Sequence, residues 1–119
     1  MNFDPMTPIW LQVAIRLKQQ IVTGDMAPGD KLPGGRDLAL QYGINPNTAA
    51  RIYQELEREG ICVTRRGLGT YVTEEQAVIA QLRSEMARQA VKRFMTDIQS
   101  LGLTKTEALE LIQKEDDDT

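Results

Sequence analysis

The chain has 119 residues, of which 41% are hydrophobic and 26% charged, so it is long enough for one small domain with an appendage. It contains no histidine and one cysteine, which excludes histidine-based metal and catalytic sites, paired-cysteine metal sites and an internal disulfide. The formal net charge is −3, a balance that at first weighs against a nucleic-acid partner.

Neither end of the chain predicts a membrane or secretory segment. No apolar run approaches the roughly 18 residues of a membrane span, and residues 1–10 lack the basic start of a secretory signal. We therefore expect a cytoplasmic protein with no membrane partner. The single cysteine, Cys62, stands between Ile61 and Val63 and is predicted to be a buried, inert thiol.

The first helix is predicted from Thr7-Pro8, read as an N-cap followed by proline at the first helical position. Gly24 can end it. Between these signals, apolar residues recur at helical spacing at Trp10, Val13, Ala14, Leu17 and Ile21.

Two shorter helices follow around a tight turn. The second is predicted from Gly35 to Tyr42, with Gly43 in a left-handed position after it. Asn45-Pro46 again reads as a cap and a first-position proline, and starts a third helix that runs to about Arg58. Its inward face is predicted to hold Ala49, Ile52, Tyr53 and Leu56.

Two short β runs come next, at residues 61–64 and 70–73, around a basic glycine-containing loop at 65–69. Helix, helix, tight turn, helix and hairpin is the order of a winged helix-turn-helix. This order predicts an α+β, mainly α fold, with a winged helix-turn-helix followed by a two-helix extension.

The extension begins with a long helix over 74–101, preceded by a possible capping box from Thr73 to Gln76. A second box, Thr104 to Glu107, starts a short helix. We expect a DNA-binding domain at 1–73, a helical dimerisation tail at 74–114 and a disordered acidic tail at 115–119. The apolar stripe of the long helix contains Ile79, Leu82, Met86, Ala90, Phe94, Ile98 and Leu101.

Such a stripe must pack on something, either the winged domain of the same chain or a partner subunit. A periodic pattern of more than about 25 residues favours a bundled partner, and a dimer suits a helix-turn-helix protein because it reads paired half-sites. Met86, Phe94 and Met95 could instead line an effector pocket, but core or interface positions are the more frequent meaning of this spacing.

Charge is divided unevenly along the chain. Residues 1–30 carry a net charge of −1, residues 31–73 carry +2 and residues 74–119 carry −4. The mildly basic middle coincides with the predicted helix-turn-helix and hairpin, so the overall negative charge does not oppose DNA binding by that part.

The start of the third helix carries side chains suited to DNA. Arginine can bind guanine, asparagine can pair with adenine, and threonine can meet a phosphate or the thymine methyl group. A recognition helix reads bases with its amino-terminal residues, which predicts DNA contacts for Asn47, Thr48 and Arg51. For Asn45 a capping role is favoured over a base contact.

Three further arginines are candidates for phosphate contacts. Arg36 begins the second helix, which crosses the DNA backbone in this motif, although a salt bridge to Asp30 or Asp37 is the alternative. Arg65 and Arg66 lie at the hairpin tip and could reach phosphates or a minor groove, or serve only solubility and edge protection.

Residues 24–39 resemble the amino-terminal motif of the GntR family of bacterial transcription regulators: a glycine, then Pro-Gly, then Leu-Pro-Ser-x-Arg-x-Leu-Ala. The similarity continues through Ile44-Asn-Pro-Asn-Thr48, Tyr53-Gln-Glu-Leu56, Glu59-Gly60 and Arg66-Gly-Leu-Gly-Thr-Tyr-Val72, and covers residues 7–73 without a gap. The Asn-Pro-Asn-Thr start and the short tail resemble the YtrA subfamily.

The resemblance implies a winged helix domain, a homodimer and operator DNA as the partner. In the YtrA group a short two-helix tail serves dimerisation, and members often repress operons for ABC-type transporters. Only 46 residues follow Thr73, too few for the large effector domains of other GntR members. The resemblance places the following residues in the DNA-contacting region: Arg36, Asn45, Pro46, Asn47, Thr48, Arg51, Arg65, Arg66, Gly67 and Gly69.

Two residues depart from the family pattern. Gly34 stands where serine is usual, so the second helix lacks a side-chain cap. Ala50 stands where many members have arginine, and Arg51 is the next residue, about 100° away around the helix. Arg51 therefore need not do the same job, and contact with a base or only with a phosphate stays open.

Two function classes follow from these observations. The first is a dimeric repressor that occupies a palindromic operator, and the alternative is a winged-helix protein-interaction module without specific DNA binding. An enzyme is not expected, because the sequence offers no nucleophile–base pair, metal set or phosphate-cradling loop. No cofactor is predicted, and the operator, the regulated genes and any small-molecule effector are left undetermined.

Overall fold

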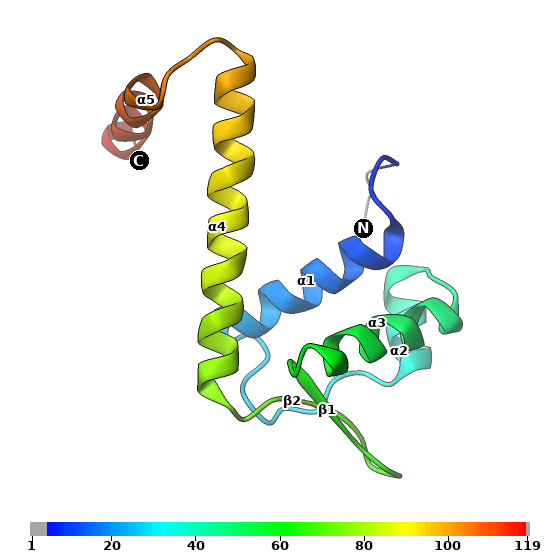
Figure 1. Cartoon of the computed structure of the whole chain (residues 1–119). Helices are drawn as coiled ribbons and strands as arrows, with labels where there is room; N and C mark the ends of the chain where they lie inside the picture. Colours follow the sequence, from blue (N-terminus) through cyan, green and yellow to red (C-terminus); the bar gives the residue numbers. More distant parts are fainter. Residues whose placement is uncertain (1–4, 119) are drawn as a thin grey trace. The chain divides into compact units, whose positions relative to one another are not determined.

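The computed structural model describes the backbone of residues 5–118 and the side chains of residues 5–115 (Figure 1). The fold is mainly helical, with a winged helix-turn-helix and two carboxyl-terminal helices, as the sequence predicted. Two compact units are formed by residues 1–82 and 83–119. The elements in chain order are α1 (Ile9–Thr23), α2 (Gly35–Tyr42), α3 (Pro46–Arg58), β1 (Cys62–Arg65), β2 (Gly69–Val72), α4 (Gln76–Ser100) and α5 (Lys105–Asp118).

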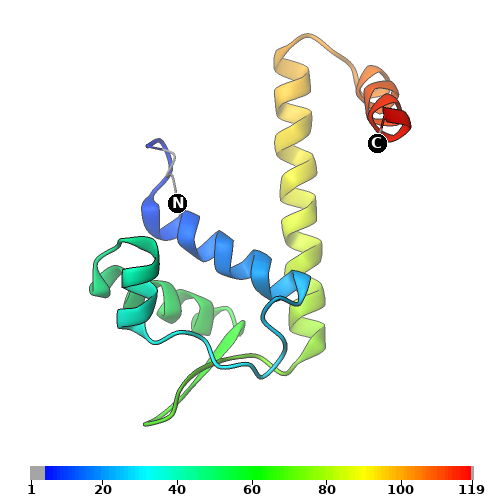
Figure 2. The same cartoon turned by 180° about the vertical axis from the view of Figure 1, so that it is seen from behind.

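The first unit is built around α3, which packs on α1 and α2. The helices α1 and α3 run side by side in the same direction (Figures 1 and 2). Two contacts agree with the parallel direction. Trp10 near the start of α1 meets Arg51 in α3, and Lys18 further along α1 meets Glu59 just after α3. The apolar stripes of the three helices meet in a closed core, whose side chains with the least exposure include Val13, Leu17, Leu38, Ala49, Ile52 and Leu56.

The turn between α2 and α3 has the predicted geometry. Gly43 adopts a left-handed φ of 65°, which strongly favours glycine, and Ile44 donates its N–H to the carbonyl of Ala39 at 2.9 Å. Asn45 and Pro46 occupy the N-cap and first helical positions of α3. The start of α1 differs from the prediction, because Pro8, with an extended ψ of 137°, takes the N-cap position that we expected of Thr7.

The hairpin of β1 and β2 forms the wing. It is antiparallel, and its register runs from Cys62 opposite Val72 to Arg65 opposite Gly69. The segment before α2 pairs with β2 through two backbone hydrogen bonds. Leu32 donates its N–H to the carbonyl of Thr70 at 2.8 Å, and Val72 donates its N–H to the carbonyl of Asp30 at 2.8 Å. The base of the wing is therefore tied to the helical core through a segment that also leads into α2.

The long helix begins later than the sequence indicated. Thr73 does not form the predicted capping box with Gln76, because its N–H still pairs with Ile61 of the hairpin at 2.9 Å and its hydroxyl accepts from Glu75 at 3.1 Å. The first compact unit also extends beyond the predicted boundary at residue 73, to Leu82. The reason is that Ile79 and Leu82 of α4 are buried.

The second unit contains the rest of α4 and α5. The predicted capping box at the start of α5 is present, with the Thr104 hydroxyl accepting from Glu107 N–H at 3.2 Å and the Glu107 carboxylate accepting from Thr104 N–H at 3.0 Å. The helix continues to Asp118, so residues 115–118 are helical and not the disordered tail that we expected, while Thr119 lies outside the described residues. None of the helices within residues 5–118 has the length and apolarity needed to cross a bilayer.

Candidate nucleic-acid interface

The amino end of α3 carries three polar side chains, those of Asn45, Asn47 and Thr48. Asn45 accepts a hydrogen bond from the N–H of Asn47 at 2.7 Å through its side chain, which confirms the capping role preferred for it. Asn47 is exposed and Thr48 is half-buried. Pro46 has no N–H, the cap takes that of Asn47, and Ala49 donates its N–H to the Asn45 carbonyl at 3.1 Å. The N–H of Thr48 is therefore the one left for an anion in this first turn.

The outer face of α3 is set by its core face. Ala49, Ile52, Tyr53 and Leu56 are buried as predicted, and at 100° per residue this turns Asn47 and Arg51 to the opposite side of the helix. Both are exposed and lie one turn apart. The face that a recognition helix would place in a major groove therefore carries an amide and a guanidinium.

Carboxylates are confined to the carboxyl half of α3. Glu55 Oε2 lies 2.8 Å from Arg58 Nη2 and Glu59 Oε1 lies 3.2 Å from Lys18 Nζ, while Glu57 accepts from the Thr64 hydroxyl at 3.2 Å. The hydrogen bond from Arg58 lowers the pKa of Glu55. The first two turns of α3 thus contain no acid that would repel a phosphate.

Arg51 does not extend freely into solvent. Its guanidinium carbon lies 4.6 Å from the centre of the Trp10 ring, which comes from the first turn of α1. The sequence placed Trp10 only in the apolar stripe of that helix, whereas the structure leaves it half-buried beneath Arg51. The sequence signal that could have indicated this contact is the position of Trp10, an aromatic residue at the start of the apolar stripe of α1.

The wing carries a similar pair. The guanidinium carbon of Arg65 lies 4.9 Å from the centre of the Tyr71 ring on the neighbouring strand. Arg66 and Gly67 are exposed at the tip, beside Leu68. The wing therefore has two arginines, Arg65 in contact with the Tyr71 ring and Arg66 exposed in the turn.

Lys31 is a cation at the wing that sequence reasoning missed. It pairs across β2 with Tyr71, and its Cε lies 2.8 Å from the position that a Cβ at Gly69 would take. Gly69 therefore has a packing reason, besides its φ of 128°: any side chain there would displace Lys31. The pairing of residues 30–32 with β2 was not predicted, and the contact between Lys31 and Gly69 was missed for that reason.

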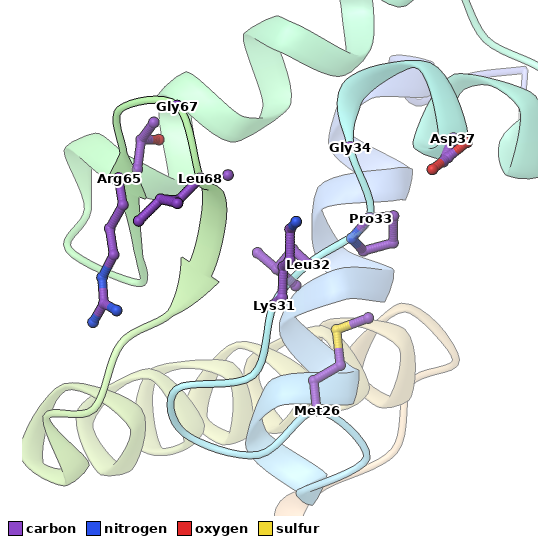
Figure 3. Close-up of a pocket in the computed structure, with 11 residues that line it drawn as sticks. Met26, Lys31, Leu32, Pro33, Gly34, Asp37, Arg65, Gly67 and Leu68 are labelled. Carbon is purple, nitrogen blue, oxygen red and sulfur yellow. The ribbon is translucent and has the colours of Figure 1, made fainter.

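A groove separates the wing from the start of α2 (Figure 3). Lys31 points into the space between the wing and the Pro33–Gly34 segment, and Arg65, Gly67 and Leu68 line the wing side. Gly34 caps α2 without a side-chain hydrogen bond, and Asp37 of the first turn of this helix also lines the groove.

Arg36 is exposed one residue into α2. Neither alternative salt bridge is present among residues 5–115, because no ion pair joins Arg36 to Asp30 or Asp37. Asp30 instead accepts from the N–H of Ala27 at 2.8 Å. The charge of Arg36 is therefore available to a phosphate next to the groove.

Two buried side chains hold these parts together. The Tyr53 hydroxyl of α3 donates to the carbonyl of Pro33, and burial raises the pKa of this phenol. Cys62 Sγ lies 3.7 Å from the carbonyl oxygen of Tyr53, and burial raises the pKa of the thiol to about 12. The expectation that Cys62 is buried is confirmed.

Comparison with known proteins agrees with this arrangement. The family model described as "Bacterial regulatory proteins, gntR family" matches residues 10–72. The chain belongs to the GntR family.

Two relatives from Bacillus subtilis illustrate the membership. The chain is 41% identical to the "Uncharacterized HTH-type transcriptional regulator YhcF" over 94% of this chain and 93% of that protein. It is 40% identical to the "HTH-type transcriptional repressor YtrA" over 82% of this chain and 75% of that protein. The relatives are named as transcriptional regulators, and the chain is not an enzyme.

Solved structures support the same assignment. A GntR family transcriptional regulator from Listeria monocytogenes aligns with a TM-score of 0.87 and 38% identity, over 94% of this chain and 98% of that one. The DNA-binding domain of AraR in complex with operator ORX1 aligns with a TM-score of 0.58 and 26% identity, over 61% of this chain and 93% of that one. DNA-binding domains of the GntR family thus bind operator DNA, and the first unit has their fold.

The seven residues predicted for dimerisation fall into two groups in this GntR chain. Ile79, Leu82 and Ile98 are buried by the chain itself, so they are not free to meet a partner. Met86 is half-buried, and Ala90, Phe94 and Leu101 are exposed. Other apolar side chains of the second unit that were not among these seven are also exposed: Val91, Leu109, Leu111 and Ile112.

Proposed function

We propose that this GntR-family chain is a homodimeric repressor that binds a palindromic operator. The observation that carries the proposal is the acid-free amino end of α3, where Asn47 and Arg51 lie exposed on the face opposite the core. A regulator of this shape would insert α3 into the major groove and block transcription by occupying the site.

Each candidate residue has a role in this proposal. Asn47 and Thr48 would contact base edges, whereas Asn45 and Pro46 would set the start of the helix. Phosphates would be bound by Arg36 and by the wing. The wing residues involved are Arg65 and Arg66, with Gly67 and Gly69 giving the close turn that lets the tip approach DNA.

The second unit would supply the dimer contact. An isolated helix of about 12–15 residues is marginal in water, and α5 has 14 residues with Leu109, Leu111 and Ile112 all about half exposed. A second copy of the chain would cover these side chains together with Phe94 and Leu101 of the same unit. Such a dimer pairs two identical half-sites, which is why a palindromic operator is expected.

The regulated operon is proposed by similarity. YtrA of Bacillus subtilis is named as a repressor, and the YtrA group is associated with ABC-type transporter operons. We propose the same kind of target for this protein, acting in the cytoplasm where bacterial operators lie.

Selection of bound DNA from a random pool tests the proposal. The expected product is a pair of inverted half-sites with centres about 34–36 Å apart or a multiple of that, with affinity that falls steeply as salt increases. Asn47→Ala should relax selection at one position in each half-site, whereas Gln19→Ala, at an exposed position of α1, should not. Absence of binding at low salt would favour the protein-interaction module.

A further inference from the structure

The only tryptophan of the chain lies beneath a candidate DNA-binding arginine. The distance of 4.6 Å from Arg51 Cζ to the Trp10 ring centre is well within the roughly 6 Å over which a ring attracts a cation. Trp10 stands at the second residue of α1 and Arg51 in the second turn of α3. Two elements of the first unit therefore meet at this contact.

Arg51 uses this ring although carboxylates stand nearby. Glu55 lies four residues further along α3, which is the spacing of a helical ion pair, but its carboxylate is bound to Arg58 at 2.8 Å. Glu59 is bound to Lys18 at 3.2 Å. Among the side chains of residues 5–115, no salt bridge includes Arg51, although its charge helps to lower the pKa of Glu55.

The contact with Trp10 leaves the guanidinium able to bind an oxyanion. A guanidinium has five N–H donors, more than a single ring contact occupies, so donors remain for a second partner. Those N–H groups match the oxygens of a phosphate in a bidentate arrangement. A stacked arginine has also given up part of its rotamer freedom before DNA arrives, which reduces the entropic cost of the contact.

The ring also determines the direction in which Arg51 points. Arg51 starts from the outer face of α3, and its guanidinium reaches the Trp10 ring of α1, so the charged group lies on the side of α3 toward α1. When a recognition helix lies in the major groove, the sugar-phosphate walls stand at its flanks and the base edges lie beneath its outer face. A guanidinium held at the flank is placed for a phosphate.

We infer that Trp10 is a positioning residue that holds Arg51 for a backbone phosphate contact and keeps it from reading a base. The inference rests on the proposed function, since it needs DNA in contact with α3. Trp10 then has a role besides the packing of α1. The sequence had left open whether Arg51 contacts a base or only a phosphate, because Ala50 stands where many family members have arginine. The inference assigns Arg51 to a phosphate.

A double-substitution cycle on the full chain tests the inference. Affinities for the selected operator and for a random duplex are measured across a salt series for wild type, R51A, W10L, W10F and the R51A/W10L double variant. We expect R51A and W10L each to weaken both DNAs about tenfold and to reduce the salt slope by about one. The double variant should be no weaker than R51A, and W10F, which keeps an aromatic face, should lie near wild type.

Several results would overturn the inference. If the double variant lost affinity by the product of the two single losses, the side chains of Arg51 and Trp10 would act independently. An unchanged salt slope in W10L would show that Arg51 needs no positioning. Loss of discrimination at one base pair by R51A, with unchanged affinity for random DNA, would make Arg51 a base reader. Ile9→Ala, at the neighbouring exposed position, is the control for a general change at the start of α1.

Tryptophan emission provides a second readout if W10L does not fold. Because Trp10 is the only tryptophan, DNA should change the emission of the wild type, and the change should be smaller in R51A. Emission that does not respond to bound DNA would overturn the inference alone. A wild-type protein that binds neither DNA at low salt would instead overturn the proposed function, and the inference with it.

Discussion

The two units of the molecule bury their apolar side chains to very different extents. In the first unit Leu38, Ile52 and Leu56 are fully buried, and the exposed groups at the amino end of α3 are polar or cationic. In the second unit Leu101 is 73% exposed and Leu109 is 53% exposed. The first unit encloses an apolar core as a single copy, although Leu40 and Leu68 are exposed on it. In the described part of the second unit, the buried apolar side chains are Ile98 and Ala108. This difference suggests that DNA is read by one unit and assembly is driven by the other.

A matched pair of leucines on α2 measures how closed the first unit is. Leu38 is fully buried and Leu40 is 82% exposed. Leu38→Ala should lower the free energy of unfolding by about 2–5 kcal/mol, because it removes buried contacts and leaves a cavity. Leu40→Ala should change it by less than about 0.5 kcal/mol. Urea unfolding followed by circular dichroism measures both changes. Equal losses of unfolding free energy in the two variants would contradict the burial of Leu38 and the exposure of Leu40.

Charges placed on the second unit should break the proposed dimer and leave the first unit folded. A double substitution, Phe94→Asp with Leu101→Asp, should give a monomer, since both side chains are exposed apolar groups of the unit proposed to assemble. Operator affinity should then fall about 100-fold, because each half-site is bound separately.

Light scattering and a shift assay measure the two effects. Leu40→Asp is the control for the oligomeric state, because it puts the same charge on an exposed leucine of the first unit. A double variant that stays dimeric would place the assembly surface elsewhere.

Local signals predicted the first unit well. Gly43 marked the end of α2, Asn45-Pro46 marked the start of α3, and Ala49, Ile52, Tyr53 and Leu56 marked its inward face. All three predictions are confirmed. These features depend on a residue's own backbone preferences and on helical periodicity, so they can be recognised without knowing what lies across the core.

Contacts between distant segments were not predictable in the same way. Lys31 reaches Gly69, and Trp10 reaches Arg51, across separations of about forty residues. Thr73 carried the pattern of a capping box, but its N–H was already paired with Ile61, so tertiary pairing overrode a local signal. Burial also divided a uniform stripe on α4, since periodicity shows which residues share a face and not which of them the chain itself covers.

The buried thiol of the first unit predicts a loss of stability at alkaline pH. The pKa of Cys62 is raised to about 12 in the folded protein, above the ordinary value of about 8.5 in an unfolded chain. The stability that this group contributes is complete below about pH 8.5 and is lost as the pH rises toward 12, because the unfolded chain gives up its proton first.

We therefore expect the free energy of unfolding to fall by about 1.5 kcal/mol between pH 8.5 and 10. Urea unfolding at the two pH values checks this, and Cys62→Ala should flatten the dependence. The folded protein should also resist thiol reagents at pH 8, whereas the unfolded chain should react at once. Rapid labelling under native conditions would contradict the burial.

The smallest expected effect lies at the uncapped start of α2. Gly34 has an extended conformation with φ −62° and ψ 162°, and a Cβ there would meet nothing within 4 Å, so serine fits without strain. Its hydroxyl could accept from a free N–H of the first turn, and Gly34→Ser should raise the free energy of unfolding by a few tenths of a kcal/mol. Gly34→Ala adds the carbon without the acceptor and should fall below wild type. Because the change is confined to the first unit, the oligomeric state should stay the same in both variants, and a shift in it would show that the two units are not independent.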